Sequence, residues 1–180
     1  MAETNLPRRR FLRGEFLTSL QSEKTKTQGF QGIRPPWAQA EDIFLQYCTR
    51  CGDCVSQCET QILIKGEGGF PEVQFSRGEC TFCQQCVQVC QQLIFRDVQT
   101  PAWQHKIEIG ANCLAQQQVE CRSCEDYCAT QAIRFQRTLG GVAKPTLQLE
   151  KCNGCGGCLQ SCPVSAIKIR HEAEEIKGTT

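Results

Sequence analysis

Cysteine is the residue type whose spacing points to chemistry, since it makes up 16 of the 180 residues, about one in eleven. Three groups of four share the spacing C-x2-C-x2-C-x3-C, and a fourth, C-x7-C-x2-C-x3-C, keeps the last two intervals. Sets of closely spaced thiols are candidate metal ligands. In chain order the groups are Cys48, Cys51, Cys54 and Cys58; Cys80, Cys83, Cys86 and Cys90; Cys113, Cys121, Cys124 and Cys128; and Cys152, Cys155, Cys158 and Cys162.

Three roles can explain so many cysteines: disulfides, zinc sites or iron–sulfur clusters. Disulfides belong to oxidising compartments, and zinc sites usually pair two distant C-x2-4-C elements without a third cysteine close by. A [4Fe-4S] cubane offers four iron corners, and one loop with three cysteines spaced by two residues can reach three of them. The regular groups therefore predict three [4Fe-4S] clusters and the variant group a fourth, with structural zinc as the alternative. For Cys113 the alternative is a buried free thiol.

The fourth cysteine of such a motif ligates the neighbouring cluster in two-cluster ferredoxins, so we assign ligands across the groups. Binding within each group is the simpler alternative, and it involves the same residues. The four expected sites are Cys48, Cys51, Cys54 and Cys90; Cys58, Cys80, Cys83 and Cys86; Cys128, Cys152, Cys155 and Cys158; and Cys113, Cys121, Cys124 and Cys162.

A longer repeat relates the two halves of the chain. A shift of 70 residues maps the first group onto the third, except that Gln118 replaces the first cysteine, and a shift of 72 maps the second group onto the fourth. This predicts an N-terminal arm over 1–40, a first ferredoxin-type unit over 41–100 and a second over 101–180. The arm has no cysteine, and docking, packing on the body and disorder are all open for it.

The elements around the cysteines predict an α+β fold made of two bacterial-type two-cluster ferredoxin units with little conventional core. Short apolar runs flank glycine-rich turns over 62–75 and 133–149, which is typical of β-hairpins, and a further strand is expected over 167–169. We expect the fourth cysteine of each group to open a short helix. Glycines at 52, 154, 156 and 157 would let the backbone approach a cluster. The clusters must supply much of the folding free energy, so the metal-free chain should be largely unfolded.

Several functions are disfavoured by composition. The formal charge of +1 suggests neither nucleic acid nor an anionic membrane as a partner, and the longest apolar runs of three residues are far too short for a membrane span. No phosphate loop, nucleophile elbow or HExxH motif is present, so an enzyme is not expected. Trp103 and His105 are expected to pack or lie on the surface, and the acids beside the cysteines to be solvated: Asp53, Glu59, Glu125 and Asp126.

The N-terminus carries a look-alike of an export signal. Residues 8–13 resemble a twin-arginine motif, but Glu15, Glu23 and Lys24 interrupt the apolar segment that a signal needs. We therefore expect the chain to stay in the cytoplasm.

Beyond the cysteine motifs, the stretches 8–14, 32–37, 68–71, 119–122 and 152–167 resemble the NapF family of ferredoxin-type proteins. The resemblance implies a cytoplasmic accessory protein of the periplasmic nitrate reductase system. It also implies a partner, the cytoplasmic precursor of the catalytic subunit, whose iron–sulfur cluster the protein would help to load before export. The family usually counts three clusters, on the regular groups. A plain electron carrier between a dehydrogenase and a reductase is the alternative function.

Overall fold

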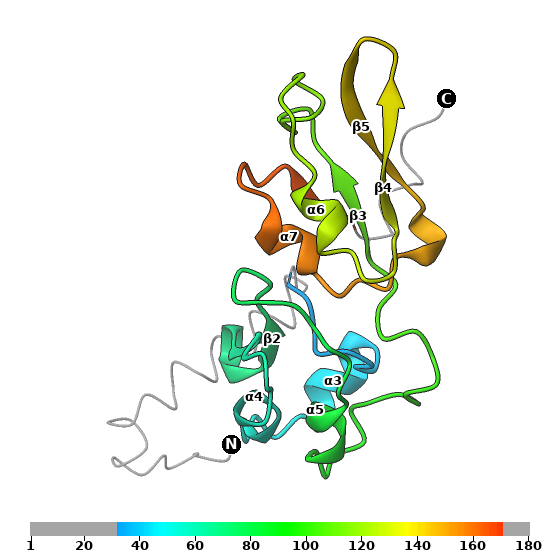
Figure 1. Ribbon diagram of the computed structural model, residues 1–180. Coiled ribbons are helices and arrows are strands. Elements are labelled where there is room, and N and C mark those ends of the chain that lie inside the picture. Colours follow the sequence, from blue (N-terminus) through cyan, green and yellow to red (C-terminus); the bar gives the residue numbers. More distant parts are fainter. Residues whose placement is uncertain (1–31, 171–180) are drawn as a thin grey trace, which may run out of the picture.

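The computed structural model describes residues 32–170 (Figure 1). Within this range short helices alternate with short strands, as the α+β prediction requires. The helices are α3 (Glu41–Tyr47), α4 (Asp53–Ser56), α5 (Gln85–Gln88), α6 (Ser123–Asp126) and α7 (Gly157–Ser161), with 3-10 turns at Glu67–Gly69 and Leu149–Lys151. The strands are β1 (Leu63–Lys65), β2 (Pro71–Val73), β3 (Lys106–Ile109), β4 (Ile133–Thr138), β5 (Gly141–Leu147) and β6 (Ile167–Arg170).

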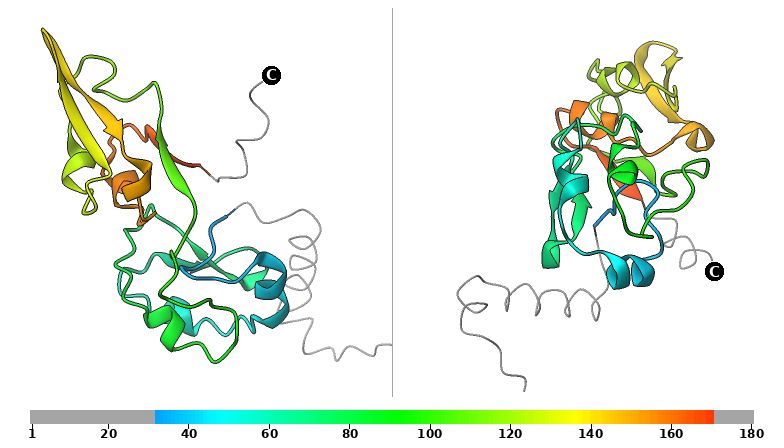
Figure 2. Two further views of the ribbon diagram at one scale, coloured as in Figure 1. Left: turned by 90° about the vertical axis from the view of Figure 1, so that its right-hand side faces the viewer. Right: turned by 90° about the horizontal axis from the view of Figure 1, so that it is seen from below.

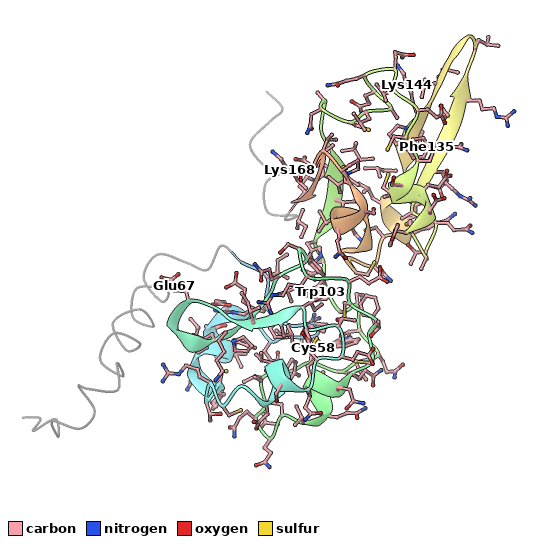
Figure 3. All side chains as sticks on the ribbon, turned by 60° about the vertical axis from the view of Figure 1, so that its left-hand side comes forward. Cys58, Glu67, Trp103, Phe135, Lys144 and Lys168 are labelled. Carbon is pink, nitrogen blue, oxygen red and sulfur yellow. The ribbon has the colours of Figure 1, made fainter. Side chains whose placement is uncertain are left out.

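Three two-stranded antiparallel sheets form in the described range. The predicted hairpins are confirmed as β1–β2, with Leu63 opposite Val73, and β4–β5, with Ile133 opposite Leu147. The predicted last strand is also present, and β6 pairs with β3, a strand that the sequence did not predict. The β4–β5 hairpin, which carries Phe135 and Lys144, is the longer one and stands away from the body (Figures 1 and 3).

The prediction that the fourth cysteine of each group opens a helix is wrong. Helices α4, α5 and α7 begin directly after a residue with positive φ, namely Gly52, Gln84 and Gly156, and the third cysteine lies inside each helix. The fourth cysteine follows the helix end. The left-handed residue reverses the chain after the second cysteine, so the turn that starts each helix comes earlier than the spacing suggested.

The described residues form two halves, one around α3–α5 and one around α6, α7 and the β3–β6 and β4–β5 pairs (Figures 1 and 2). The core of the first half contains Ile62, Leu63, Val73 and Phe75 together with Cys54 and Cys86. The core of the second contains Ile107, Ile133 and Ile167 together with Cys124 and Cys158. Leu159 packs against both cores and Ile169 of β6 packs against the first, so the halves share apolar contacts.

The described part of the predicted arm packs on the first half. The Trp37 amide donates to Ala102 O over 2.9 Å, its indole Nε1 donates to Thr100 O over 2.9 Å, and Ala38 forms a bridge with Phe95. The twin-arginine look-alike and the rest of the arm lie outside the described residues. Among the helices of residues 32–170, none has the length and apolarity needed to span a bilayer.

Candidate metal centres

The first candidate site collects cysteines from both groups of the first half. Cys48, Cys51, Cys54 and Cys90 line one cavity. Burial, followed by the neighbouring thiols, raises the pKa of Cys54 to about 12. A thiol with such a pKa carries its proton at neutral pH, so a metal that binds there must displace the proton.

The second candidate site also collects cysteines from both groups of the first half. Cys58, Cys80, Cys83 and Cys86 line a cavity that Trp37 and Phe82 also border. Burial, together with the charges of neighbouring thiols, raises the pKa of Cys80 and of Cys86 to about 12.

The third candidate site lies in the second half. Burial raises the pKa of Cys158 to about 12, and Cys155, Cys152 and Cys128 are the next causes in order. The pKa of the Cys155 thiol is also raised, chiefly by burial, and Glu79 and Cys128 are among the charges that contribute. These four cysteines therefore lie together, as the assignment across groups expects.

The fourth candidate site contains the displaced cysteine. Cys113, Cys121, Cys124 and Cys162 line one cavity. Burial raises the pKa of Cys124 to about 11, and Cys113 is the next largest cause.

The β3–β6 pair explains how Cys113 replaces the cysteine lost at Gln118. The loop after β3 is tied to the segment after Cys162, because the Gly110 amide donates to Ala166 O over 2.7 Å. Asn112 Nδ2 donates to Val164 O over 2.9 Å in the same place. The pairing of β3 with β6 thus brings Cys113, which follows β3, close to Cys162. The spacing of the cysteines along the sequence does not reveal this contact.

The donor chemistry of the four groups fits a [4Fe-4S] cluster. Each candidate site brings four thiols together, and in three of the sites all four thiols line one cavity. Within residues 32–170 no three Cys, His, Asp or Glu side chains converge tightly enough for a single metal ion. The thiols instead surround a cavity, which is the arrangement that a polynuclear cluster needs.

Backbone amides also point at the sulfur atoms. The Phe82 amide donates to Cys80 Sγ over 3.4 Å, and the Ala166 amide donates to Cys162 Sγ over 3.2 Å. The amides of Arg50 and Gly157 play the same part for Cys48 and Cys155. Such donors stabilise thiolate charge and tune the potential of a bound cluster.

The three regular groups share one backbone pattern. The residue before the second cysteine and the residue after it both have positive φ: Arg50 and Gly52, Phe82 and Gln84, Gly154 and Gly156. The variant group breaks this pattern, because Arg122, which follows Cys121, has φ −134°. Its different loop agrees with its different first cysteine.

Two of the acids that were expected to be solvated make specific hydrogen bonds. Glu59 accepts the Thr81 hydroxyl beside the second site, and Glu125 accepts the Phe135 amide over 3.1 Å beside the fourth. Trp103 and His105 pack as expected, with ring centroids 5.2 Å apart. Sequence reasoning missed Glu79, whose carboxylate reaches the third site from the first half.

Two ferredoxin-like halves with four-thiol cavities define an iron–sulfur protein of the polyferredoxin class. Family models described as "4Fe-4S dicluster domain" match residues 47–94 and 119–173. No solved structure matches significantly.

The chain belongs to the NapF family of ferredoxin-type proteins, and it is therefore a [4Fe-4S]-binding electron carrier and not an enzyme. It is 54% identical to "Ferredoxin-type protein NapF" of Haemophilus influenzae over 169 residues, which cover 94% of this chain and 96% of the relative. It is 51% identical to the Escherichia coli K12 protein of the same name over 140 residues, or 78% and 85%. "Methylamine utilization ferredoxin-type protein MauM" of Methylorubrum extorquens is 29% identical over 180 residues, or 88% and 80%.

Proposed function

We propose that this ferredoxin holds four [4Fe-4S] clusters, one at each of the four candidate sites described above, each of which takes cysteines from two groups. We further propose that it works in the cytoplasm on the precursor of the catalytic subunit of periplasmic nitrate reductase, whose iron–sulfur cluster it helps to load before export. The similarity to the NapF relatives over nearly the whole chain carries the proposal. The four groups of convergent thiols support the cluster number.

The proposed domain organisation follows the boundaries predicted from the sequence. Residues 41–100 and 101–180 each form a two-cluster unit, and residues 1–40 form the arm. The two matched family segments, 47–94 and 119–173, lie one in each unit and support this division.

Bound clusters change the charge that a partner meets. A [4Fe-4S]2+ cluster with four thiolates carries −2, so four clusters add −8 to the formal +1 and give −7. We expect the docking face of the partner to be basic, which would steer the encounter and make it sensitive to salt.

The maturation role is tested in a strain that lacks this protein. The catalytic subunit is purified from that strain and its iron is measured per chain. A subunit without its iron supports loading, because only a defect in assembly removes the cluster. A subunit with full iron that still accepts electrons from a chemical donor contradicts it.

A plain electron carrier between a dehydrogenase and a reductase is the second candidate. The similarity to MauM favours it, because the name of that relative places a related ferredoxin in a different redox system. In the same deletion strain, full iron in the subunit together with loss of electron supply from the physiological donor would select the carrier.

The arm can be tested separately. A chain lacking residues 1–31 keeps Trp37 and its hydrogen bonds to the body. Loss of binding to the metal-free catalytic subunit, with the iron content unchanged, would make this segment the docking element. Unchanged binding would assign docking to the ferredoxin units.

A further inference from the structure

Three glycines of the last cysteine loop lie where the halves meet: Gly156 and Gly157 face Phe75 and Glu79 of the first half, and Gly154 faces His105, which precedes β3. Gly154, Gly156 and Gly157 are buried, and a β-carbon at any of them would collide with a side chain from outside the second unit's core. His105 Nε2 would lie 2.7 Å from a β-carbon at Gly154. The Phe75 ring faces Gly156 in the same way, and the Glu79 carboxylate faces Gly157.

Backbone conformation does not explain these glycines. The equivalent loop of the first half has Phe82 and Gln84 at φ 58° and 65°, where the last loop has Gly154 and Gly156 at 78° and 85°. Side chains are therefore accommodated in this left-handed geometry elsewhere in the same molecule. Beside the last loop the structure places side chains of the other half, because Phe75 and Glu79 pack directly on the backbone of Gly156 and Gly157.

The close approach places two candidate ligands in contact. The Cys80 amide donates to Cys155 O over 2.9 Å, and Cys155 is one of the charges that act on the Cys80 thiol. Cys80 belongs to the second site and Cys155 to the third. His105 Nε2 lies 3.1 Å from Gly154 O, and its ring packs on Phe75 with centroids 6.1 Å apart, so the junction is held from both sides.

The other junctions of the molecule lie inside the halves. Cys54 of the first site acts on Cys86 of the second, and Cys124 of the fourth acts on Cys158 of the third. Together with the contact between Cys80 and Cys155, these neighbours arrange the four sites in one unbroken order. Trp103, labelled in Figure 3, packs against the core of the first half.

We propose that Gly154, Gly156 and Gly157 are positioning residues that dock the two halves and join their clusters into a single four-member electron relay. Without this docking surface the protein would contain two independent pairs. Each transfer across the junction moves one electron from a reduced cluster to its oxidised neighbour, with no bond made and no proton moved. The inference rests on the proposed binding of four clusters.

The test uses the full-length holoprotein reduced with dithionite. Gly156→Gln introduces the residue that the equivalent position 84 already carries, and Gly140→Gln is the control, because Gly140 has φ +71° but no atom within 4 Å of its β-carbon position. We expect both variants to keep the iron content and the visible spectrum of the natural chain. In electron paramagnetic resonance, Gly156→Gln should lose the spin–spin coupling between second and third clusters and keep the coupling within each half.

If Phe75→Ala restores the coupling between the second and third clusters in the Gly156→Gln variant, the steric fit between the Phe75 ring and Gly156 determines how the halves pack. Gly154→Ala, a one-methyl change against His105, is the second variant if Gly156→Gln fails to fold, and it should weaken the same coupling. The relay is overturned if the variants keep the same spin–spin coupling between the second and third clusters as the natural chain. It is also overturned if the natural chain itself shows coupling only within each half. Absence of iron from the natural chain would instead overturn the proposed function.

Discussion

The carboxylate of Glu125 accepts a hydrogen bond from the backbone amide of Phe135, over 3.1 Å. The same carboxylate lies 3.5 Å from Arg122 Nε, and the Arg122 guanidinium lies 5.4 Å from the centre of the Phe135 ring. These contacts fix the start of the β4–β5 hairpin to α6, which carries Cys124 of the fourth site. An acid that looks like a surface residue in the sequence thus supports a candidate metal centre.

Glu125→Ala should therefore loosen the fourth site. Removing a charged acceptor from a half-buried amide costs about 1–3 kcal/mol, which is roughly a 5- to 150-fold change in an equilibrium. We expect the holoprotein to lose its visible absorption faster in guanidinium, because the hairpin opens more often. Asp126→Ala is the matched control, since Asp126 is the exposed neighbour on the same helix. Equal bleaching of both variants would contradict the role of Glu125.

Cys113→Ala should remove one cluster and leave three. Four-iron stoichiometry gives about 16 iron atoms per natural chain, falling to about 12 in the variant, with sulfide falling in parallel. Gln117→Ala, in the exposed loop that follows Cys113, should keep about 16. A value near 12 for the natural chain would remove the fourth site and leave the family's usual count of three.

Removing iron should unfold the protein. The inner cysteine of each group belongs to an apolar core, Cys54 and Cys86 in one half and Cys124 and Cys158 in the other. Stripping the clusters with a chelator under reducing conditions leaves four crowded thiols in each site, and we expect the far-ultraviolet circular dichroism to lose its helix and strand signal. A metal-free chain that keeps dispersed amide resonances would show that the polypeptide core suffices on its own.

Arg34→Lys should destabilise the first half. Arg34 Nε and Nη2 donate to the two oxygens of Glu41 over 2.9 and 2.6 Å, and the guanidinium lies 5.0 Å from the Phe44 ring centre. Lysine can keep one contact but neither the paired geometry nor the flat stacking surface. We expect a loss of about 1–3 kcal/mol, seen as faster bleaching in guanidinium. The exposed Arg77 offers the control: if Arg77→Lys bleaches as fast, the buried pair is not the cause.

The sequence predicted the grouping of the cysteines because the spacing within each loop is local and the repeat shows which loops are partners. It also predicted both hairpins, whose turns carry glycine between apolar runs. It could not predict β3 or the route by which Cys113 reaches Cys162, since both depend on pairing with β6 some 60 residues later. The helix starts were misplaced because Gln84, which is not a glycine, adopts the left-handed conformation before α5.

The sequence predicted that the glycines of the last loop let the backbone approach a cluster, and this stays a prediction. The structure adds packed side chains beside the same glycines, namely Phe75, His105 and Glu79. In the sequence alone, the stretch 32–37 served only as part of the family resemblance. The Arg34–Glu41 ion pair gives a physical reason for the arginine in this stretch.

The cysteines inside the two apolar cores give the protein a built-in sensitivity to oxygen. If these thiols ligate clusters as proposed, oxidative loss of a cluster also removes the packing of Cys54 and Cys86, or of Cys124 and Cys158, from the interior. Damaged molecules then expose their backbone to proteases, so degradation clears inactive copies without a dedicated sensor. We therefore expect the lifetime of the chain in a cell to shorten as its exposure to oxygen increases.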